Sequence, residues 1–164
     1  MKLTASVLTI SDRSYKGTRQ DESGPKIIEL LTRNDFEIVN YEIVPDEISM
    51  ITKKLSEWID QGKSRLVFTS GGTGFAPRDN TPEATKKIIE KETPGISEYI
   101  RNRSIEKTPH AILSRGVSGI SKKTLIINLP GSPKAACESI EFILNIIPHA
   151  IALIIDDPNS ENNH

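Results

Sequence analysis

The 164-residue sequence has a single cysteine, Cys137, and only three histidines. One thiol cannot build a disulfide framework or a cysteine metal site, so neither is expected. Lys and Arg total 21 and Asp and Glu total 22, for a formal net charge of −1 at pH 7. Without a basic excess, the composition gives no support for nucleic-acid binding or for attachment to an anionic membrane. No apolar run reaches the ~18 residues that a membrane-spanning helix needs, which predicts no transmembrane segment.

The N-terminal stretch MKLTASVLTISDR alternates polar and apolar residues and lacks the apolar core of a signal peptide. Together with the single cysteine, this predicts a cytoplasmic protein. The length favours one domain, which we place at residues 1–155. Residues 156–164 are polar and are expected to form a mobile tail.

Strand-like and helix-like segments alternate along the whole chain. The predicted strands are 2–11, 36–44, 66–68 and 124–129, and the predicted helices begin near Pro25, Ile48, Thr81, Ile96 and Lys134. The last helix is predicted to be kinked at Pro148 and to continue to Ile155. This alternation predicts an α/β domain with a mostly parallel sheet and helices on both faces.

The stretch LVFTSGGTGFAPRDNTPEA, residues 66–84, stands out as a glycine-rich loop between a buried strand and a helix. Three glycines within four positions require a sharp turn or a close approach by a ligand. Thr81 is the expected N-cap of the following helix, with Pro82 at its first position. A strand, a glycine-rich loop and a helix N-terminus are typical of an anion-binding site. Neither the G-x-x-x-x-G-K-[ST] nor the G-x-G-x-x-G signature is present.

Polar side chains also follow the other predicted strands. The strand-end segments are Ser11–Asp12, Pro45–Asp46–Glu47, Ser70–Asp79 and Pro130–Pro133. The carboxyl ends of parallel strands share one edge of the sheet, so these segments are expected to meet there. Their carboxylates suit Mg²⁺ or acid–base chemistry. Structural alternatives remain: Asp46 as a helix N-cap, Asp12 as a cap or turn residue, and Arg115 as a plain surface side chain.

Four motifs together resemble a known family. SGGTGFAPRDNTPEA, KETPG, TPHAILSRGVSGI and LIINLPGSP closely resemble the MogA/MoaB/gephyrin G-domain family, and the resemblance runs from TISD to the last helix. It implies a three-layer α/β/α fold, a homotrimer and contact with the metal-inserting enzyme of the same pathway. The implied activity is molybdopterin adenylyltransfer with Mg²⁺: AMP passes from ATP to the terminal phosphate of molybdopterin, and pyrophosphate is released. The resemblance does not distinguish a molybdenum from a tungsten pathway.

The resemblance also assigns site residues. Asp46 and Asp79 are the expected catalytic carboxylates and Mg²⁺ ligands. Molybdopterin and its phosphate are expected at Ser70, Gly71, Gly72, Thr73, Gly74, Arg78, Ser114 and Arg115. The nucleotide is expected at Ser11, Asp12, Ser23, Gly24, Gly131 and Ser132. Alternative functions are a MoaB-like protein that binds molybdopterin without adenylylating it, a trimeric interaction module, and an unrelated Mg²⁺-dependent nucleotide enzyme.

Overall fold

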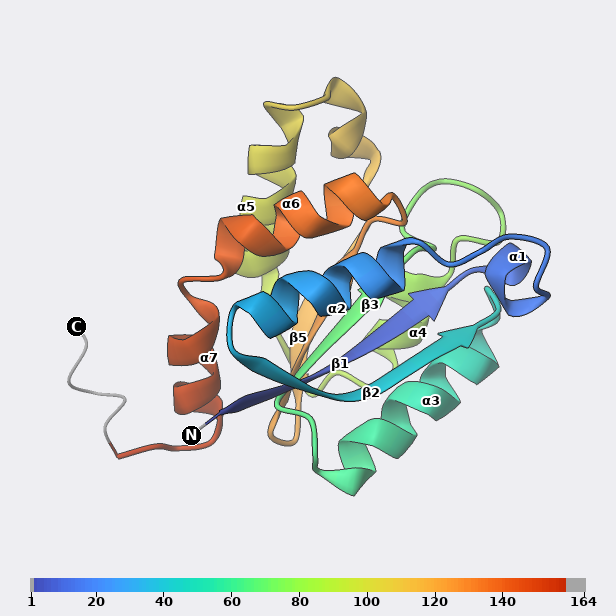
Figure 1. The fold of residues 1–164 in the computed structure, drawn as a ribbon. Helices are drawn as coiled ribbons and strands as arrows, with labels where there is room; N and C mark the ends of the chain where they lie inside the picture. Colours follow the sequence, from blue (N-terminus) through green and yellow to red (C-terminus); the bar gives the residue numbers. More distant parts are fainter. Residues whose placement is uncertain (1, 159–164) are drawn as a thin grey trace.

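The part of the chain that the structure describes folds around one six-stranded sheet (Figure 1). The computed structural model describes residues 2–158. The strand order is β2-β1-β3-β6-β5-β4, in which β1, β2, β3 and β6 are parallel and β5 runs antiparallel to both of its neighbours. The strands are β1 (Leu3–Ile10), β2 (Phe36–Val44), β3 (Leu66–Ser70), β4 (Lys91–Glu92), β5 (Ser118–Ser121) and β6 (Thr124–Leu129).

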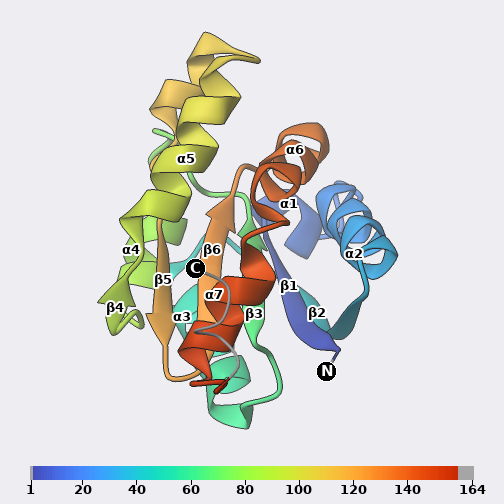
Figure 2. The same ribbon diagram turned by 90° about the vertical axis from the view of Figure 1, so that its left-hand side faces the viewer.

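Helices cover both faces of this sheet, so the predicted three-layer α/β/α fold is confirmed (Figures 1 and 2). One face carries α2 (Ser23–Arg33), α5 (Pro94–Ile105), α6 (Pro133–Ile143) and α7 (Ile147–Ile154). The other face carries α3 (Ile48–Gln61) and α4 (Thr81–Lys86). Two separate hydrophobic cores result, one between the sheet and each helical layer.

The central strands divide their side chains between these two cores. In β3, Val67 packs toward α3 and α4, whereas Phe68 packs toward α2 and α6. Ile126 and Ile127 of β6 alternate in the same way. Burial on both faces explains why these strands are continuous apolar runs rather than alternating ones. Trp58 of α3 is 1% exposed and lies in the core, as its helical spacing predicts.

The antiparallel edge formed by β4 and β5 was not predicted. The segment Ser118–Ser121 has only one large apolar residue, and it turns into β6 through Lys122, whose φ is +51°. Gly119 permits the close packing of this edge, because a Cβ there would lie 2.4 Å from Ile89 Cγ2. The helix that begins at Thr81 was expected to end near residues 93–95, but it ends at Lys86, before β4.

The C-terminal helix is interrupted earlier than predicted. The chain leaves α6 at Ile143 and starts α7 at Ile147, with a 69° bend between the two helices. Pro148 lies in the first turn of α7, where proline is tolerated, so its assignment as the kink was wrong. Within residues 2–158 no single helix is long and apolar enough to cross a membrane, although the bent α6–α7 pair passes on length and composition alone. Most of the predicted tail, residues 159–164, lies outside the described residues.

Candidate functional site

A crevice opens beyond the carboxyl ends of β1 and β3, where the direction of the strand connections reverses. The chain leaves β1 through α2 on one face of the sheet and leaves β3 through α4 on the other. In open α/β sheets this divergence leaves a ligand-binding crevice between the two strands. A cavity of about 540 Å³, called here the first cavity, lies at this position.

The first cavity brings together most of the predicted site. The predicted residues among its lining are Ser11, Asp12, Ser23, Asp46, Ser70, Gly71, Gly72, Asp79, Gly131 and Ser132. Four separate strand ends therefore contribute to one cavity, as expected for parallel strands. Arg13, Arg19, Gln20 and Asp21 also line it and were not predicted. They come from the long polar segment between β1 and α2, which carries no recognisable spacing.

Two helix N-termini reach the same cavity. Ser132 is the N-cap of α6 and its Oγ accepts a hydrogen bond from Ala135 N at 3.4 Å. Ser23, also on the cavity wall, is the first residue of α2. Helix N-termini favour anions through their free N–H groups and the helix dipole. The first cavity is therefore suited to phosphate groups.

The glycine-rich loop requires glycine at its first two positions. Gly71 has φ +107°, and a Cβ there would lie 2.2 Å from the carbonyl oxygen of Ile10. Gly72 has φ +66°, a left-handed conformation that L side chains rarely adopt. The Gly71 N–H donates to the Leu129 carbonyl at 3.2 Å. The loop is thus held directly against β1 and β6.

Thr81 fastens this loop from the other side. Its Oγ1 donates to the Gly71 carbonyl at 2.8 Å and its N–H donates to the Gly72 carbonyl at 3.1 Å. The N-cap of α4 is Asn80, and Thr81 is already the first helical residue. The prediction that Thr81 caps the helix was therefore wrong, because its hydroxyl is engaged by the loop. Pro82 consequently occupies the second helical position.

Gly72→Ala is expected to destabilise the chain and to weaken binding at the loop. Gly62 provides a matched control, because it has the same φ of +66° but its Cβ would meet nothing within 4 Å. Backbone strain alone should cost about 1 kcal/mol at either site. At Gly72 the Cβ would also lie 2.3 Å from Thr81 Oγ1 and 3.2 Å from Asp46 Oδ1.

Gly72 lines the first cavity, so thermal unfolding and equilibrium binding of ATP measure these effects. Gly62→Ala should leave affinity unchanged. Gly72→Ala should lose roughly a further 1–2 kcal/mol of stability and at least about tenfold in affinity. Equal behaviour of the two variants would contradict the crowding argument.

Asp12 and Asp46 are joined by reciprocal hydrogen bonds. The Asp12 N–H donates to Asp46 Oδ2 at 2.8 Å, and the Asp46 N–H donates to Asp12 Oδ1 at 3.0 Å. Arg78 Nη2 also donates to Asp12 Oδ1, at 2.9 Å. The N-cap of α3 is Glu47, so the alternative in which Asp46 caps that helix is excluded. The cap of the short helix α1 (Asp12–Tyr15) is Ser11, not Asp12.

In the first cavity the pKa values of Asp12 and Asp46 are shifted in opposite directions. The hydrogen bond from Arg78 lowers the pKa of Asp12. Burial raises the pKa of Asp46, and the negative charges of Asp12 and Asp79 raise it further. An ionised Asp46 is therefore costly unless a cation lies nearby.

The carboxylates of the first cavity suit a divalent cation that takes most of its ligands from water and substrate rather than from the protein. Within residues 2–158 no group of three or more His, Cys, Asp or Glu side chains could hold a metal ion. Mg²⁺ commonly binds through one or two carboxylates, with waters and substrate phosphates completing its shell. Asp46 and Asp79 are the residues that would hold it here.

Asp21 is a structural member of the site that the sequence reasoning missed. Its carboxylate accepts hydrogen bonds from Thr9 Oγ1 at 2.7 Å, from Ser23 Oγ and the Gly24 N–H at 3.2 Å each, and from the Tyr41 hydroxyl. A Cβ on Gly24 would lie 2.5 Å from Asp21 Oδ2. Gly24 therefore leaves the space that the Asp21 carboxylate needs. An Asp three residues before an N-terminal helical amide is a capping signal that could have identified it.

A second cavity, of about 310 Å³, lies on the other side of the glycine-rich loop. It is enclosed by α5, α6 and the 3₁₀ helix η1 (Pro109–Leu113). Thr73, Gly74 and Ser114 of the predicted set line it. Its other polar lining residues, which were not predicted, include Ser97, Arg101, Ser104, His110, Asn128 and Ser139. The glycine-rich loop therefore separates two cavities, with Gly71 and Gly72 facing one and Thr73 and Gly74 facing the other.

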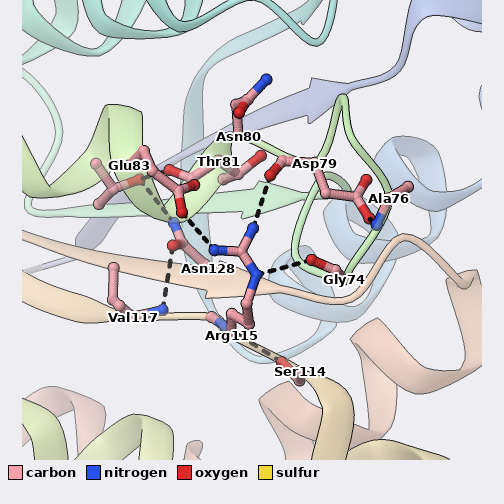
Figure 3. Close-up of polar contacts among 12 residues, drawn as sticks. Gly74, Ala76, Asp79, Asn80, Thr81, Glu83, Ser114, Arg115, Val117 and Asn128 are labelled. Atoms are coloured by element: carbon pink, nitrogen blue, oxygen red, sulfur yellow. Dashed lines mark hydrogen bonds and ion pairs between the residues drawn. The ribbon is translucent and has the colours of Figure 1, made fainter.

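The remaining predicted residues, Gly24, Arg78 and Arg115, line neither of these two cavities. Arg78 is exposed and pairs with Asp12. Arg115 points toward the glycine-rich loop (Figure 3), where its guanidinium contacts Gly74, Asp79 and Glu83. These contacts exclude the alternative that Arg115 is a plain surface side chain.

Comparison with known proteins places the chain in a family. Residues 6–149 match the family model described as a probable molybdopterin binding domain. The molybdopterin adenylyltransferase of Helicobacter pylori (strain J99) is 47% identical over 152 residues, covering 91% of this chain and 86% of that protein. The chain belongs to this family of molybdopterin-binding domains.

Two further relatives differ in how much of their own length this chain spans. The molybdenum cofactor synthesis protein cinnamon of Drosophila melanogaster is 48% identical over 157 residues. These residues cover 94% of this chain but only 26% of that protein. The crystal structure of the molybdopterin biosynthesis enzyme MoaB from Thermus thermophilus is 48% identical, with a TM-score of 0.89 over 95% of this chain and 98% of that one. The same domain thus occurs alone and within longer proteins.

Proposed function

We propose that this chain is a molybdopterin adenylyltransferase of molybdenum cofactor biosynthesis. The observation that carries the proposal is the meeting of two cavities at one glycine-rich loop, with Asp46 and Asp79 on the wall of the first. The identity to adenylyltransferases supports the same reaction. A transferase that joins two substrates needs two adjoining subsites, and this arrangement supplies them.

The first cavity is assigned to ATP and the second to the pterin. Helix N-termini and serine hydroxyls around the first cavity suit a polyphosphate. The second cavity is smaller and adjoins the predicted pterin residues Thr73, Gly74 and Ser114. The terminal phosphate of molybdopterin then reaches the α-phosphate of ATP across the loop.

The reaction needs no protein nucleophile. A phosphate oxygen of molybdopterin forms a bond to the α-phosphorus of ATP, and the bond from that phosphorus to the bridging oxygen breaks, which releases pyrophosphate. The chain contributes positioning, and catalysis of this kind relies on orientation and charge neutralisation. Bound Mg²⁺ would supply the positive charge that the phosphates need. Asp46 and Asp79 would hold that ion beside the loop.

We also propose a cytoplasmic setting and, as the family resemblance implies, a homotrimer that contacts the metal-inserting enzyme of its pathway. Exposed apolar side chains support self-association. Phe75 is 69% exposed and Ile112 is 64% exposed, at the glycine-rich loop and in η1. Contiguous exposed apolar surface marks protein–protein contact sites, and we propose that these two side chains belong to such a surface. Light scattering of the purified chain tests this, and a monomer at working concentration would refute it.

A pyrophosphate-release assay tests the proposed reaction. Purified chain, Mg²⁺ and ATP should release pyrophosphate only when molybdopterin is added, in a one-to-one ratio with the molybdopterin consumed. Omitting Mg²⁺ should abolish release. Pyrophosphate formed equally without molybdopterin would identify a different nucleotide-dependent reaction.

A MoaB-like protein that binds molybdopterin without adenylylating it is the second candidate. The similarity to the MoaB structure favours it, at 48% identity over nearly the whole chain. Under this alternative molybdopterin binds but no pyrophosphate forms at any ATP concentration. The same assay, run beside a molybdopterin-binding measurement, therefore separates the two functions.

A further inference from the structure

The Asp79 loop, defined here as residues 74–79, is held at both ends by one side chain. Arg115 Nε donates to the Gly74 carbonyl at 2.8 Å, and Arg115 Nη2 donates to the Asp79 carbonyl at 2.7 Å (Figure 3). The Arg115 N–H also donates to the Thr73 carbonyl at 2.8 Å. Residues 73, 74 and 79 are thus all fixed from a segment more than 35 positions away in sequence.

Glu83 completes this arrangement. It lies in the first turn of α4, and its carboxylate forms an ion pair with Arg115 Nη1. The hydrogen bond from Arg115 lowers the pKa of Glu83, so the pair is ionised at neutral pH. A guanidinium can hold a carboxylate and two carbonyls at once because its donors form a rigid planar fork.

The orientation of the Asp79 carboxylate depends on the shape of this loop. Asp79 Oδ2 accepts a hydrogen bond from the Ala76 N–H at 3.0 Å, and the Asp79 N–H donates to the Ala76 carbonyl at 2.9 Å. Phe75, between the two ends, is largely exposed and contributes no core packing. The clamp at Gly74 and Asp79 is therefore what keeps the turn, and with it the carboxylate, in place.

We propose that Arg115 and Glu83 are a positioning pair that holds the Asp79 carboxylate at the first cavity, and that Arg115 does not bind the molybdopterin phosphate. The proposal rests on the proposed adenylyltransferase function for its kinetic part only. It replaces the role that the family resemblance implied for Arg115. The three donations to the protein, and the position of Arg115 outside both cavities, are the observations that carry it.

Arg115→Met removes the clamp while keeping an unbranched side chain. We expect kcat to fall about 100-fold, because misplacing a catalytic group by about 1 Å costs this much. The KM values for ATP and molybdopterin should stay within about threefold. Arg115→Lys can reach one carbonyl but not both, and should recover about tenfold of the loss. Arg33→Met is the matched control: Arg33 is exposed and pairs with Glu29 in α2, so this variant should leave turnover unchanged.

Amide hydrogen exchange gives a readout that does not depend on activity. In Arg115→Met the Ala76 and Asp79 amides should exchange at least about tenfold faster, because the turn that protects them loosens. The sheet amides should be unaffected if the variant remains folded. Exchange in the Arg115→Lys and Glu83→Gln variants provides the same test should Arg115→Met fail to fold.

A double-mutant cycle tests the pairing itself. Glu83→Gln alone should lower kcat, and Arg115→Met/Glu83→Gln should be no worse than Arg115→Met, because the two residues act through one contact. Additive losses would overturn the pair.

The outcomes separate this proposal from the proposed function. A KM for molybdopterin raised at least about tenfold in Arg115→Met, with kcat and amide exchange unchanged, would show that Arg115 binds substrate and would overturn the inference. Absence of turnover in the wild-type chain would refute the function, and the exchange rates would then decide the inference alone. Unchanged exchange would reject it, and faster exchange confined to residues 74–80 would support it.

Discussion

Asp79→Asn should lower turnover by about 10³-fold while the fold is retained. Asp79 lines the first cavity and its charge acts on Asp46, so the two carboxylates face one volume. Asn keeps an oxygen that can accept the Ala76 N–H, now made to Asp79 Oδ2, but it lacks the negative charge. The loop should therefore keep its shape, and molybdopterin binding in the second cavity should be little changed. Single-turnover rates, with thermal unfolding of the same samples, measure both effects.

Asp60→Asn is the control for this substitution. Asp60 is exposed, lies near the C-terminal end of α3 and pairs with Lys122. The same chemical change there should leave turnover within about twofold, since surface ion pairs contribute little. Loss of folding in Asp79→Asn, or retention of full turnover, would remove Asp79 from the catalytic assignment.

Asp46→Asn should also abolish turnover, but it should make the unliganded chain more stable. Burial raises the pKa of Asp46 above its unfolded value, so the folded state binds the proton more tightly than the unfolded state does. The stability from this group is fully present below the unfolded pKa and is lost as pH rises through the folded pKa. At neutral pH the ionised carboxylate therefore lowers the folding stability, which a neutral Asn does not. The Asn amide oxygen can still accept the hydrogen bond from the Asp12 N–H.

We expect a Tm about 1–3 °C higher for Asp46→Asn at pH 7 without Mg²⁺. The difference should vanish at pH values below the unfolded Asp pKa, where both side chains are neutral. Adding Mg²⁺ with ATP should stabilise the wild-type chain and not the variant, because ligand binding to the folded state raises Tm. A lower Tm for Asp46→Asn at pH 7 would contradict the electrostatic argument.

Residue patterns predicted the central part of the fold well. The parallel strands β1, β2, β3 and β6 are buried apolar or alternating runs bounded by Gly, Pro or Asp, and such runs have a clear signature. Helices α2 and α3 have a strong apolar stripe. The short strands β4 and β5 lack this signature. Their register is set by the pairing of β5 with β6, by the pairing of β4 with β5, and by the packing of Ile89 against Gly119.

The site was predictable in composition but less so in the role of each residue. Strand-end position and residue type were enough to bring Asp12, Asp46, Asp79 and Ser132 to one cavity. Thr81 and Arg115 were assigned other roles, because their hydrogen bonds go to loop carbonyls that only the folded chain brings near. Asp21 was missed although its spacing to Gly24 is a capping signal, because its partners Thr9 and Tyr41 come from two strands that only the folded chain brings together.

The second cavity was not predicted as a separate space. Its walls come from α5, η1 and α6. No residue spacing within these elements identifies the side chains that line the cavity. Ser104 and His110 are ordinary polar residues in sequence, and they gain significance only beside Gly74 and Ser114. Tertiary packing, rather than local pattern, creates this half of the site.

The most direct test follows the adenylyl group itself. Purified chain is mixed with Mg²⁺, molybdopterin and ATP labelled in its α-phosphate. The products are then separated and identified by mass spectrometry. We expect the label to appear in adenylylated molybdopterin, with one pyrophosphate released for each product formed, and we expect Asp79→Asn to stop both. Label that stays in ATP while molybdopterin remains bound would contradict the account and leave a molybdopterin-binding protein.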